Sequence, residues 1–216
     1  MIKLIACLLM LTDHIGHVFF THIIEIRYVG RLAMPFFAYS IARGFYYSNQ
    51  KGTVKKYIRN MAIFALISQV PFHFFVSNRL NIGVTWLLSL FLLDSLVNQR
   101  ELYKKIIVFI GVFMSSYIIN IDYGLYGVLF PLCFYFFLFS KRNILLMVLS
   151  FSALFGFYLI ISNGTGTIQV YTFFCIPLLL LTEPYDHYIK INKYFFYLFY
   201  PVHIAILELI SRFIAI

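Results

Sequence analysis

Charged residues are scarce in this sequence. Asp, Glu, Lys and Arg make up 12% of its 216 residues, and only eight of these are acidic, whereas soluble domains contain about 25% charged residues. A soluble globule of this composition would expose much of the 62% of the chain that is hydrophobic. Intrinsic disorder is also excluded, because disordered chains lack the 26 Phe and 17 Tyr found here.

Cysteine is scarce too, and the basic residues form no single patch. The three cysteines, Cys7, Cys133 and Cys175, all lie in apolar runs, so we expect reduced packing residues rather than a disulfide framework. The 17 Lys and Arg occur as short clusters between apolar runs. This pattern does not indicate a nucleic-acid partner; it is typical of a polytopic membrane protein.

Long apolar runs account for most of the chain. A membrane-spanning helix needs about 20 predominantly apolar residues, and such runs lie near residues 4–23, 28–47, 58–77, 82–97, 105–121, 123–140, 143–162, 166–182 and 194–213. They predict an all-α, polytopic integral membrane protein with about nine transmembrane helices, or eight or ten if neighbouring runs fuse or divide. The connections are short, so we expect residues 1–216 to form a single transmembrane domain.

The charges of the connections predict the orientation. If the N-terminus is cytoplasmic, only Arg27, Arg79 and Arg212 lie outside, and twelve basic residues lie inside. Cytoplasmic loops are enriched in Lys and Arg, so this bias predicts a cytoplasmic N-terminus. The twelve inside residues are Lys3, Lys51, Lys55, Lys56, Arg59, Arg100, Lys104, Lys105, Lys141, Arg142, Lys190 and Lys193.

Several polar residues interrupt the predicted spans. An Asp or Arg at the centre of a span costs about 2.5–3.5 kcal/mol, so such residues are expected to face partners or a wet cavity. Asp13 and His17 share one helix face, because they are four residues apart. A partner for His14 must come from another helix, and Arg31 and His203 lie at compatible depths.

Two of the prolines inside these runs lie next to the polar residues. Pro35 cannot bond the carbonyl of Arg31, and Pro201 cannot bond that of Tyr197. Membrane helices tolerate such kinks where neighbouring groups or water satisfy the freed carbonyls. Both prolines adjoin the polar residues, so an internal polar cavity is expected there.

Six short motifs, in order along nearly the whole chain, resemble those of the TraX family. They are Leu11-Thr12-Asp13-His14-Ile15-Gly16, residues 30–38 followed by Arg43-Gly44-Phe45, Ser68-Gln69-Val70-Pro71-Phe72, residues 81–85, residues 122–127 and Tyr200-Pro201-Val202-His203. The family is named for a conjugation-associated membrane protein that acetylates the N-terminus of pilin. The resemblance implies an acetyltransferase of the bacterial cytoplasmic membrane that takes its acetyl group from acetyl-CoA. Its acceptor would be a pilin-like peptide amine or a cell-surface glycan hydroxyl.

The residue types suit this reaction, which needs a base and a donor for the oxyanion. We expect His14 to be the general base, Asp13 and His203 to shape its protonation, and Arg31 to stabilise the oxyanion. We expect the acceptor to be held by His17, Asn81, Thr85 and Tyr123; Asn81, with Thr85, is also a candidate partner of the oxyanion. Arg43, Lys51, Lys55 and Lys56 would bind the phosphates of coenzyme A at the cytoplasmic mouth, although the positive-inside pattern alone also explains the lysines.

Two other functions fit the same residues. Intramembrane His, Asp and Arg also mark proton or ion paths, as in a transporter. A non-catalytic membrane scaffold is the third hypothesis, but it leaves the mid-depth charges unexplained. No metal is expected, because no second carboxylate or cysteine cluster accompanies His14, His17 and His203.

Overall fold

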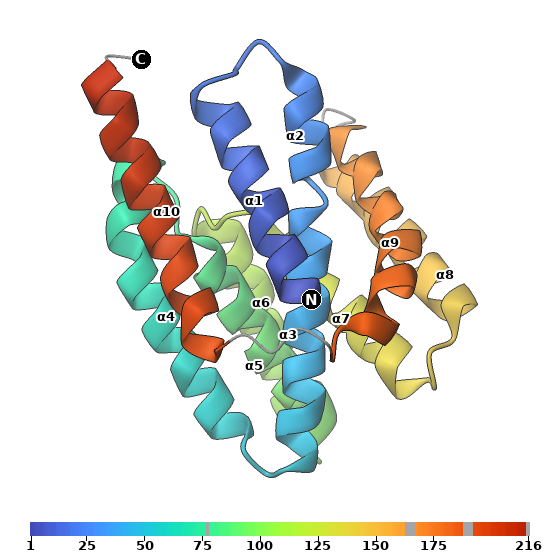
Figure 1. Cartoon of the computed structure of the whole chain (residues 1–216). Helices are drawn as coiled ribbons and strands as arrows, with labels where there is room; N and C mark the ends of the chain where they lie inside the picture. The colour runs from blue at the N-terminus through green and yellow to red at the C-terminus, as the bar shows by residue number, and fades with distance from the viewer. Residues whose placement is uncertain (77, 163–166, 188–191, 215–216) are drawn as a thin grey trace. The chain divides into compact units, whose positions relative to one another are not determined.

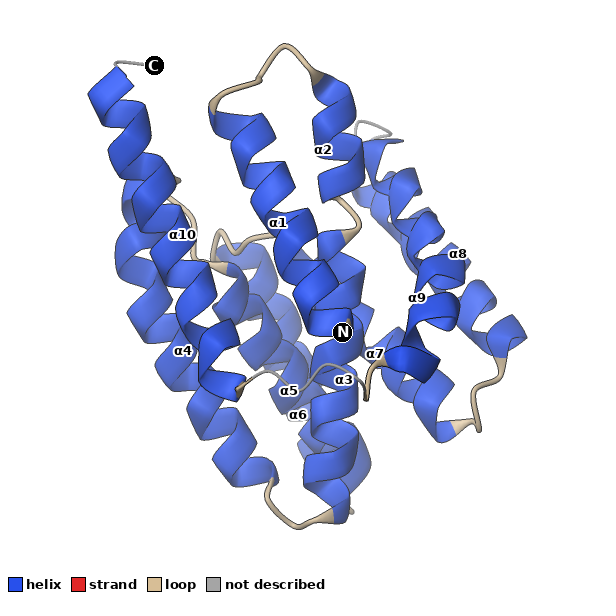
Figure 2. Cartoon of the chain, viewed as in Figure 1, coloured by secondary structure: helices blue, strands red, loops and turns tan. Residues whose placement is uncertain are grey.

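The computed structural model describes residues 1–76, 78–162, 167–187 and 192–214. Over these ranges its regular elements are all helical (Figure 1, Figure 2), which confirms the predicted all-α class. The elements are α1 (Ile2–Val18), α2 (Ile24–Gly30), α3 (Ala33–Gln50), α4 (Val54–Phe75), α5 (Ile82–Asn98), α6 (Leu102–Ile118), α7 (Gly124–Phe139), α8 (Ile144–Ile161), the 3-10 helix η1 (Thr167–Phe174), α9 (Cys175–Thr182), the 3-10 helix η2 (Glu183–Tyr185) and α10 (Lys193–Ile214).

Most of the predicted runs coincide with one helix, but two are divided. The run 82–97 matches α5 almost residue for residue, whereas 28–47 becomes α2 and α3, and 166–182 becomes η1 and α9. Of the basic residues used to orient the chain, Lys190 lies outside the described residues.

The division between α2 and α3 corrects the expected position of Pro35. This proline lies in the first turn of α3 rather than inside a longer helix, because its ring would clash with the carbonyl of Arg31 in a continuous helix. In a first turn its missing N–H costs little, since that group has no helical partner there. The helix therefore ends with the Arg31 N–H donating to the Arg27 carbonyl at 3.0 Å, which leaves Arg31 at the break. Pro201, in contrast, lies inside α10 as expected.

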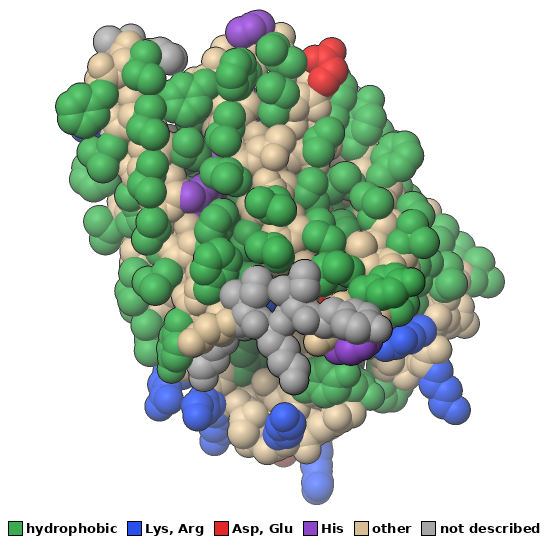
Figure 3. All heavy atoms as spheres, viewed as in Figure 1, with side chains coloured by type: hydrophobic (Ala, Val, Ile, Leu, Met, Phe, Trp, Pro, Cys, Tyr) green, Lys and Arg blue, Asp and Glu red, His purple; other side chains and the backbone are tan. Residues whose placement is uncertain are grey.

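Two of the described helices are long and apolar enough to cross a membrane. They cover Ile144–Ile161 and Tyr194–Ile214, and Ile82–Asn98 and Gly124–Phe139 are apolar but shorter. Large hydrophobic side chains on the two long helices are exposed, as Phe213 is on α10. Hydrophobic side chains also cover most of the face of α1 and α10 that Figure 3 presents.

The chain divides into two compact units. The first comprises Met1–Ser40 and Val148–Ile216, and the second comprises Ile41–Met147, so the boundaries fall within α3 and α8. In the first unit α1 packs against α2 and α10 (Figure 1). In the second unit α5 is central and packs against α4, α6 and α7.

Glycines allow the close approach of α1 and α2 in the first unit. A Cβ added at Gly30 would lie 2.5 Å from the Cα and 2.8 Å from the backbone nitrogen of Asp13. A Cβ at Gly16 would lie 2.7 Å from the Cγ2 of Ile26. Only residues without a side chain let the two backbones come this close, so these glycines determine how closely α1 approaches α2 at Asp13.

Polar contacts at the other end of α1 fix the position of this helix. The Asp186 carboxylate accepts a hydrogen bond of 2.8 Å from the backbone N–H of Ile2, one of the N–H groups that a helix start leaves without a helical partner. The Tyr39 hydroxyl donates to the Glu183 carboxylate at 2.6 Å, which joins α3 to η2. These contacts hold α1 and α3 against the segment that follows α9.

Candidate active site

Two histidines from opposite ends of the chain meet in the first unit. His14 of α1 and His203 of α10 are 189 residues apart, yet His14 Nδ1 lies 2.8 Å from His203 Nε2. The two ring planes are nearly parallel, at 11°. His203 is buried, and its Nδ1 lies 2.6 Å from the carbonyl oxygen of Phe199. The structure therefore brings together the pair that the sequence placed at compatible depths.

The carbonyl of Phe199 determines which nitrogens carry protons when both rings are neutral. A carbonyl oxygen only accepts hydrogen bonds, so His203 Nδ1 is the donor and its Nε2 has the lone pair. His14 Nδ1 must then donate to His203, which leaves the lone pair of His14 on Nε2. This tautomer, assigned from the hydrogen-bond partners, gives His14 the form that a general base needs.

Aromatic rings of α10 hold His203 in place. The ring of Phe199 lies 4.8 Å from that of His203 at 23°, and the ring of Tyr200 lies 5.8 Å away at 67°. Tyr200 is buried and also contacts His14, with 6.5 Å between ring centroids. Sequence reasoning gave neither ring a role in the site, although their spacing of four and three residues from His203 is that of neighbours on one helix face.

Charged side chains on α1, on α2 and at the break after α2 act on the histidines. The charge of Arg31 acts on both His14 and His17, and those of Asp13 and Arg27 act on His17. The sequence had assigned Arg27 to an outside loop, but the structure places it on α2. Its position four residues before Arg31, on the same helix face, was the signal that could have identified it.

Two buried polar atoms of this cluster make no hydrogen bond to any described residue. They are Oδ1 of Asp13 and Nε of Arg27. Buried polar atoms nearly always have a partner, so these two are the groups that a bound polar ligand or water would satisfy. One accepts and the other donates, and both belong to residues that act on His17.

The residues expected to bind coenzyme A belong to the second unit. Arg43 lies in the part of α3 assigned to that unit, with its guanidinium 5.8 Å from the centre of the Tyr47 ring. Lys51 follows α3, and Lys55 and Lys56 begin α4; all three are exposed. Their expected role in binding phosphate stays a prediction.

Three of the residues expected to hold the acceptor also lie in the second unit, and two of them stabilise its fold. Asn81 is fully buried and caps α5: its Oδ1 accepts from Gly83 N–H at 2.8 Å, and its Nδ2 donates to the Ala65 carbonyl and to Gln69 Oε1, each at 2.8 Å. Thr85 donates to the carbonyl of Asp122 at 2.7 Å. The third, Tyr123, has a φ of 59° and caps α7. Sequence reasoning missed Gln69, whose side chain completes the Asn81 network.

A family model described as TraX protein matches residues 1–211. The chain belongs to the TraX family. No curated protein and no solved structure matched it. The match spans both units of this TraX chain and includes the histidine pair, Arg27, Arg31 and Asn81.

The arrangement in this TraX chain suits proton transfer. Among the described residues, no group of three or more His, Cys, Asp or Glu is placed to hold a metal ion. If His14 Nε2 gains a proton, His14 Nδ1 still donates to His203, so the hydrogen bond fits both states of His14. The pair therefore resembles, in chemical role, a catalytic histidine and the group that orients it. The guanidinium groups of Arg27 and Arg31 supply positive charge to the same cluster.

Proposed function

We propose that this TraX-family chain is a membrane-embedded acetyltransferase that transfers the acetyl group of cytoplasmic acetyl-CoA to an amine or hydroxyl outside the cytoplasm or on a membrane-borne acceptor. The observation that carries the proposal is the 2.8 Å contact between His14 and His203. It supports a base with its lone pair on His14 Nε2, beside the positive charge of Arg31. A base and an oxyanion partner are the two groups that acyl transfer requires.

The proposed setting is the bacterial cytoplasmic membrane, crossed several times, with the N-terminus in the cytoplasm. Apolar helices, two of them of spanning length, support it, as does the bias of basic residues towards one set of connections. Charged residues within α1 and α2 then face protein rather than lipid. This setting gives the enzyme access to a donor on one side and an acceptor on the other.

The proposed reaction is a direct transfer. His14 Nε2 removes a proton from the acceptor amine or hydroxyl as its nitrogen or oxygen attacks the thioester carbonyl. Negative charge builds on the carbonyl oxygen, where Arg31, with Arg27, stabilises it. The intermediate then collapses: the C–S bond breaks, the new C–N or C–O bond remains, and the coenzyme A thiolate takes the proton from His14. His203 holds the His14 ring in place throughout and positions it.

The family and the charges support the choice of proposed substrates. The pilin link of the TraX family favours a peptide N-terminus as acceptor, and a cell-surface glycan hydroxyl is the other candidate. His17 lies within the charged cluster and is the residue proposed to contact the acceptor. Arg43, Lys51, Lys55 and Lys56 carry the charges proposed to hold the phosphates of coenzyme A.

A proton-coupled transporter is the second candidate, because of one observation. His14, His203 and the Phe199 carbonyl form a chain of hydrogen bonds inside the first unit. Ionisable groups within spans commonly relay protons in transporters. The two functions differ in what they consume: acyl transfer uses acetyl-CoA, whereas transport moves an ion and leaves acetyl-CoA intact.

The test uses the purified chain in liposomes with radiolabelled acetyl-CoA and a short peptide bearing a free N-terminus. We expect thiol release and label on the peptide for the wild type. We expect neither for His14→Ala, whereas His22→Ala keeps wild-type rates, because His22 is an exposed histidine between α1 and α2. Ion flux without any use of acetyl-CoA would support the transporter instead, and full activity of His14→Ala would exclude His14 as the base.

A further inference from the structure

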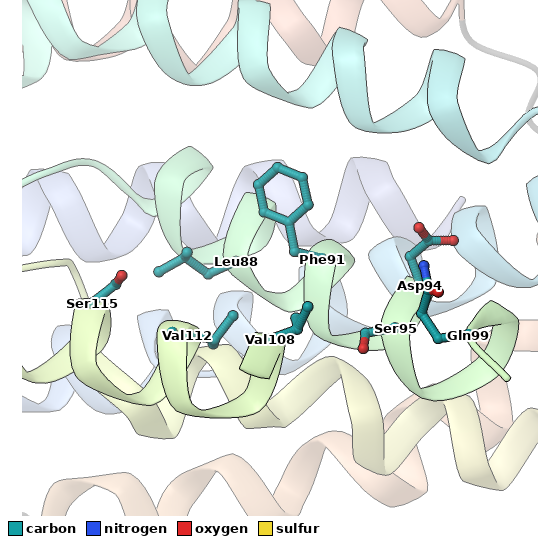
Figure 4. A pocket seen from close by; sticks show the side chains of 9 residues that line it. Leu88, Phe91, Asp94, Ser95, Gln99, Val108, Val112 and Ser115 are labelled. Atoms are coloured by element: carbon teal, nitrogen blue, oxygen red, sulfur yellow. The ribbon is translucent and has the colours of Figure 1, made fainter. Parts of the chain in front are cut away.

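A groove runs between α5 and α6 in the second unit, far in sequence from the histidine pair. Its volume is about 270 Å³, close to the lower limit of about 300 Å³ for small-molecule sites. Figure 4 shows side chains of both helices along it. We name it the α5–α6 groove and define it by Leu88, Phe91, Asp94, Ser95, Val108 and Val112.

The hydroxyl of Ser95 is the first sign of a missing partner. Ser95 is 3% exposed, and its Oγ makes no hydrogen bond to any described residue. Two other helical serines, in contrast, bond the carbonyl four residues earlier: Ser40 bonds that of Phe36 at 3.0 Å, and Ser152 that of Val148 at 2.9 Å. A buried hydroxyl without a partner is unfavourable, so the lining of the groove offers a donor to a ligand (Figure 4).

Gly111 of α6 is the second sign. It also lines the groove, and a Cβ added there would meet no atom within 4 Å. At Gly30, in contrast, the neighbouring helix fills that space. The space beside Gly111 is therefore open to a bound molecule.

The two ends of the groove differ in polarity. The carboxylate of Asp94 lies at the end nearest the α6 N-terminus, where it accepts a hydrogen bond of 2.6 Å from Asn98. Just beyond it the connection to α6 carries an exposed Arg100, and Lys105 donates to the Leu96 carbonyl at 3.0 Å. The rest of the lining is mostly apolar. A matching ligand has an apolar chain at one end and both a cation and an anion at the other.

Exposed apolar residues next to the groove indicate where this ligand comes from. Ile107 is 63% exposed and Ile110 is 53% exposed, both on α6. In a membrane such a surface faces lipid tails. The basic residues Arg100, Lys104 and Lys105 follow the positive-inside pattern, so the polar end of the groove lies at the inner leaflet.

We propose that the α5–α6 groove binds one phospholipid with a primary-amine headgroup. One acyl chain lies between Leu88, Phe91, Val108 and Val112, and an ester oxygen accepts the hydrogen bond of Ser95. The ammonium group of the lipid pairs with Asp94, and its phosphate pairs with Arg100 and Lys105. The proposal rests on the membrane setting of the proposed function but not on acetyl transfer.

The test compares three lipids with identical acyl chains on the purified, delipidated full-length chain. We expect phosphatidylethanolamine to raise the midpoint of thermal unfolding at least twice as much as phosphatidylcholine, whose quaternary amine has no N–H, or phosphatidylglycerol, which has no amine. Native mass spectrometry should show one bound phosphatidylethanolamine. Equal shifts with all three lipids, or no bound lipid, would overturn the proposal.

Two variants locate the lipid. Gly111→Leu places a side chain in the groove from a position where an added Cβ meets no atom within 4 Å, so it should remove the phosphatidylethanolamine shift while the chain stays folded. At its matched control, Gly156→Leu on α8, an added Cβ also meets no atom within 4 Å, and this variant should keep the shift. Ser95→Ala should at least halve the shift; an undiminished shift in both Gly111→Leu and Ser95→Ala contradicts the proposed site.

The inference and the proposed function can fail separately. His14→Ala should lose acetyl transfer and still bind phosphatidylethanolamine with a full thermal shift. Acetyl transfer by a wild-type chain that binds no lipid in the groove would exclude the lipid site alone. Lipid binding by a chain that never uses acetyl-CoA would exclude the transferase alone.

Discussion

The substitution Gly30→Ala tests how strictly the crossing of α1 and α2 controls the site. The added Cβ would lie 2.5 Å from the Cα of Asp13, whereas carbon atoms in contact are about 3.5–4.0 Å apart. The two helices must therefore separate by about 1 Å. Overpacking of this kind lowers the free energy of unfolding by about 1–3 kcal/mol. Replacing a helical glycine by alanine otherwise raises it by up to about 1 kcal/mol, so the cost equals or exceeds the gain.

The effect on activity should be larger than the effect on stability. His14 follows Asp13 directly and is 2.8 Å from His203, so a shift of α1 by about 1 Å can lengthen this contact beyond the range of a hydrogen bond. Misplacement by about 1 Å costs on the order of 100-fold in rate. We expect Gly30→Ala to lower the rate of acetyl transfer from labelled acetyl-CoA by about 100-fold. We also expect it to lower the midpoint of thermal unfolding.

The matched control is Gly156→Ala. A Cβ at Gly156 meets nothing within 4 Å, so this variant should be at least as stable as the wild type and fully active. If Gly30→Ala behaves like Gly156→Ala in both assays, the reasoning about the α1–α2 crossing is wrong.

Three further predictions concern other parts of the chain. His203→Phe should slow acetyl transfer by about 10²–10⁴-fold, whereas His203→Gln, whose amide can both donate and accept, should retain more activity; equal loss in both would contradict the tautomer assignment. Asn81→Ala should lower the free energy of unfolding by about 2 kcal/mol, because it removes a helix cap and two further hydrogen bonds, while Asn98→Ala, at an exposed position, should change it little. Single cysteines at Thr21 and Gly52 should be labelled by an impermeant thiol reagent from opposite sides of the membrane, and labelling from one side would contradict the proposed topology.

Much of the fold could be predicted from the sequence, since the hydrophobic runs are long. The run 82–97 gave α5 directly, because it is apolar and begins at a helix-capping asparagine, Asn81. The end of α2 could not be located in the same way. Hydropathy is continuous across Arg31, and only the steric effect of Pro35 on the preceding turn divides the run into two helices.

The candidate site could be predicted only in part, because hydropathy identifies unusual residues but not their neighbours. Residues that interrupt apolar runs, such as His14 and His203, stand out in the sequence. Arg27 and Tyr200 do not: one lies in a short helix at the edge of a run, and the other is one of 17 tyrosines. Asn81 stood out as polar, but the structure shows that its hydrogen bonds are made within the fold.

The most direct test of the central claim is the amount of radiolabelled acetyl group that a purified wild-type chain and its His14→Ala variant transfer to a peptide amine. The measurement requires both proteins to be folded, as shown by matching unfolding midpoints, and uses His22→Ala as the control. The account predicts transfer by the wild type and by His22→Ala, and none above background by His14→Ala. Equal transfer by His14→Ala and the wild type would contradict it.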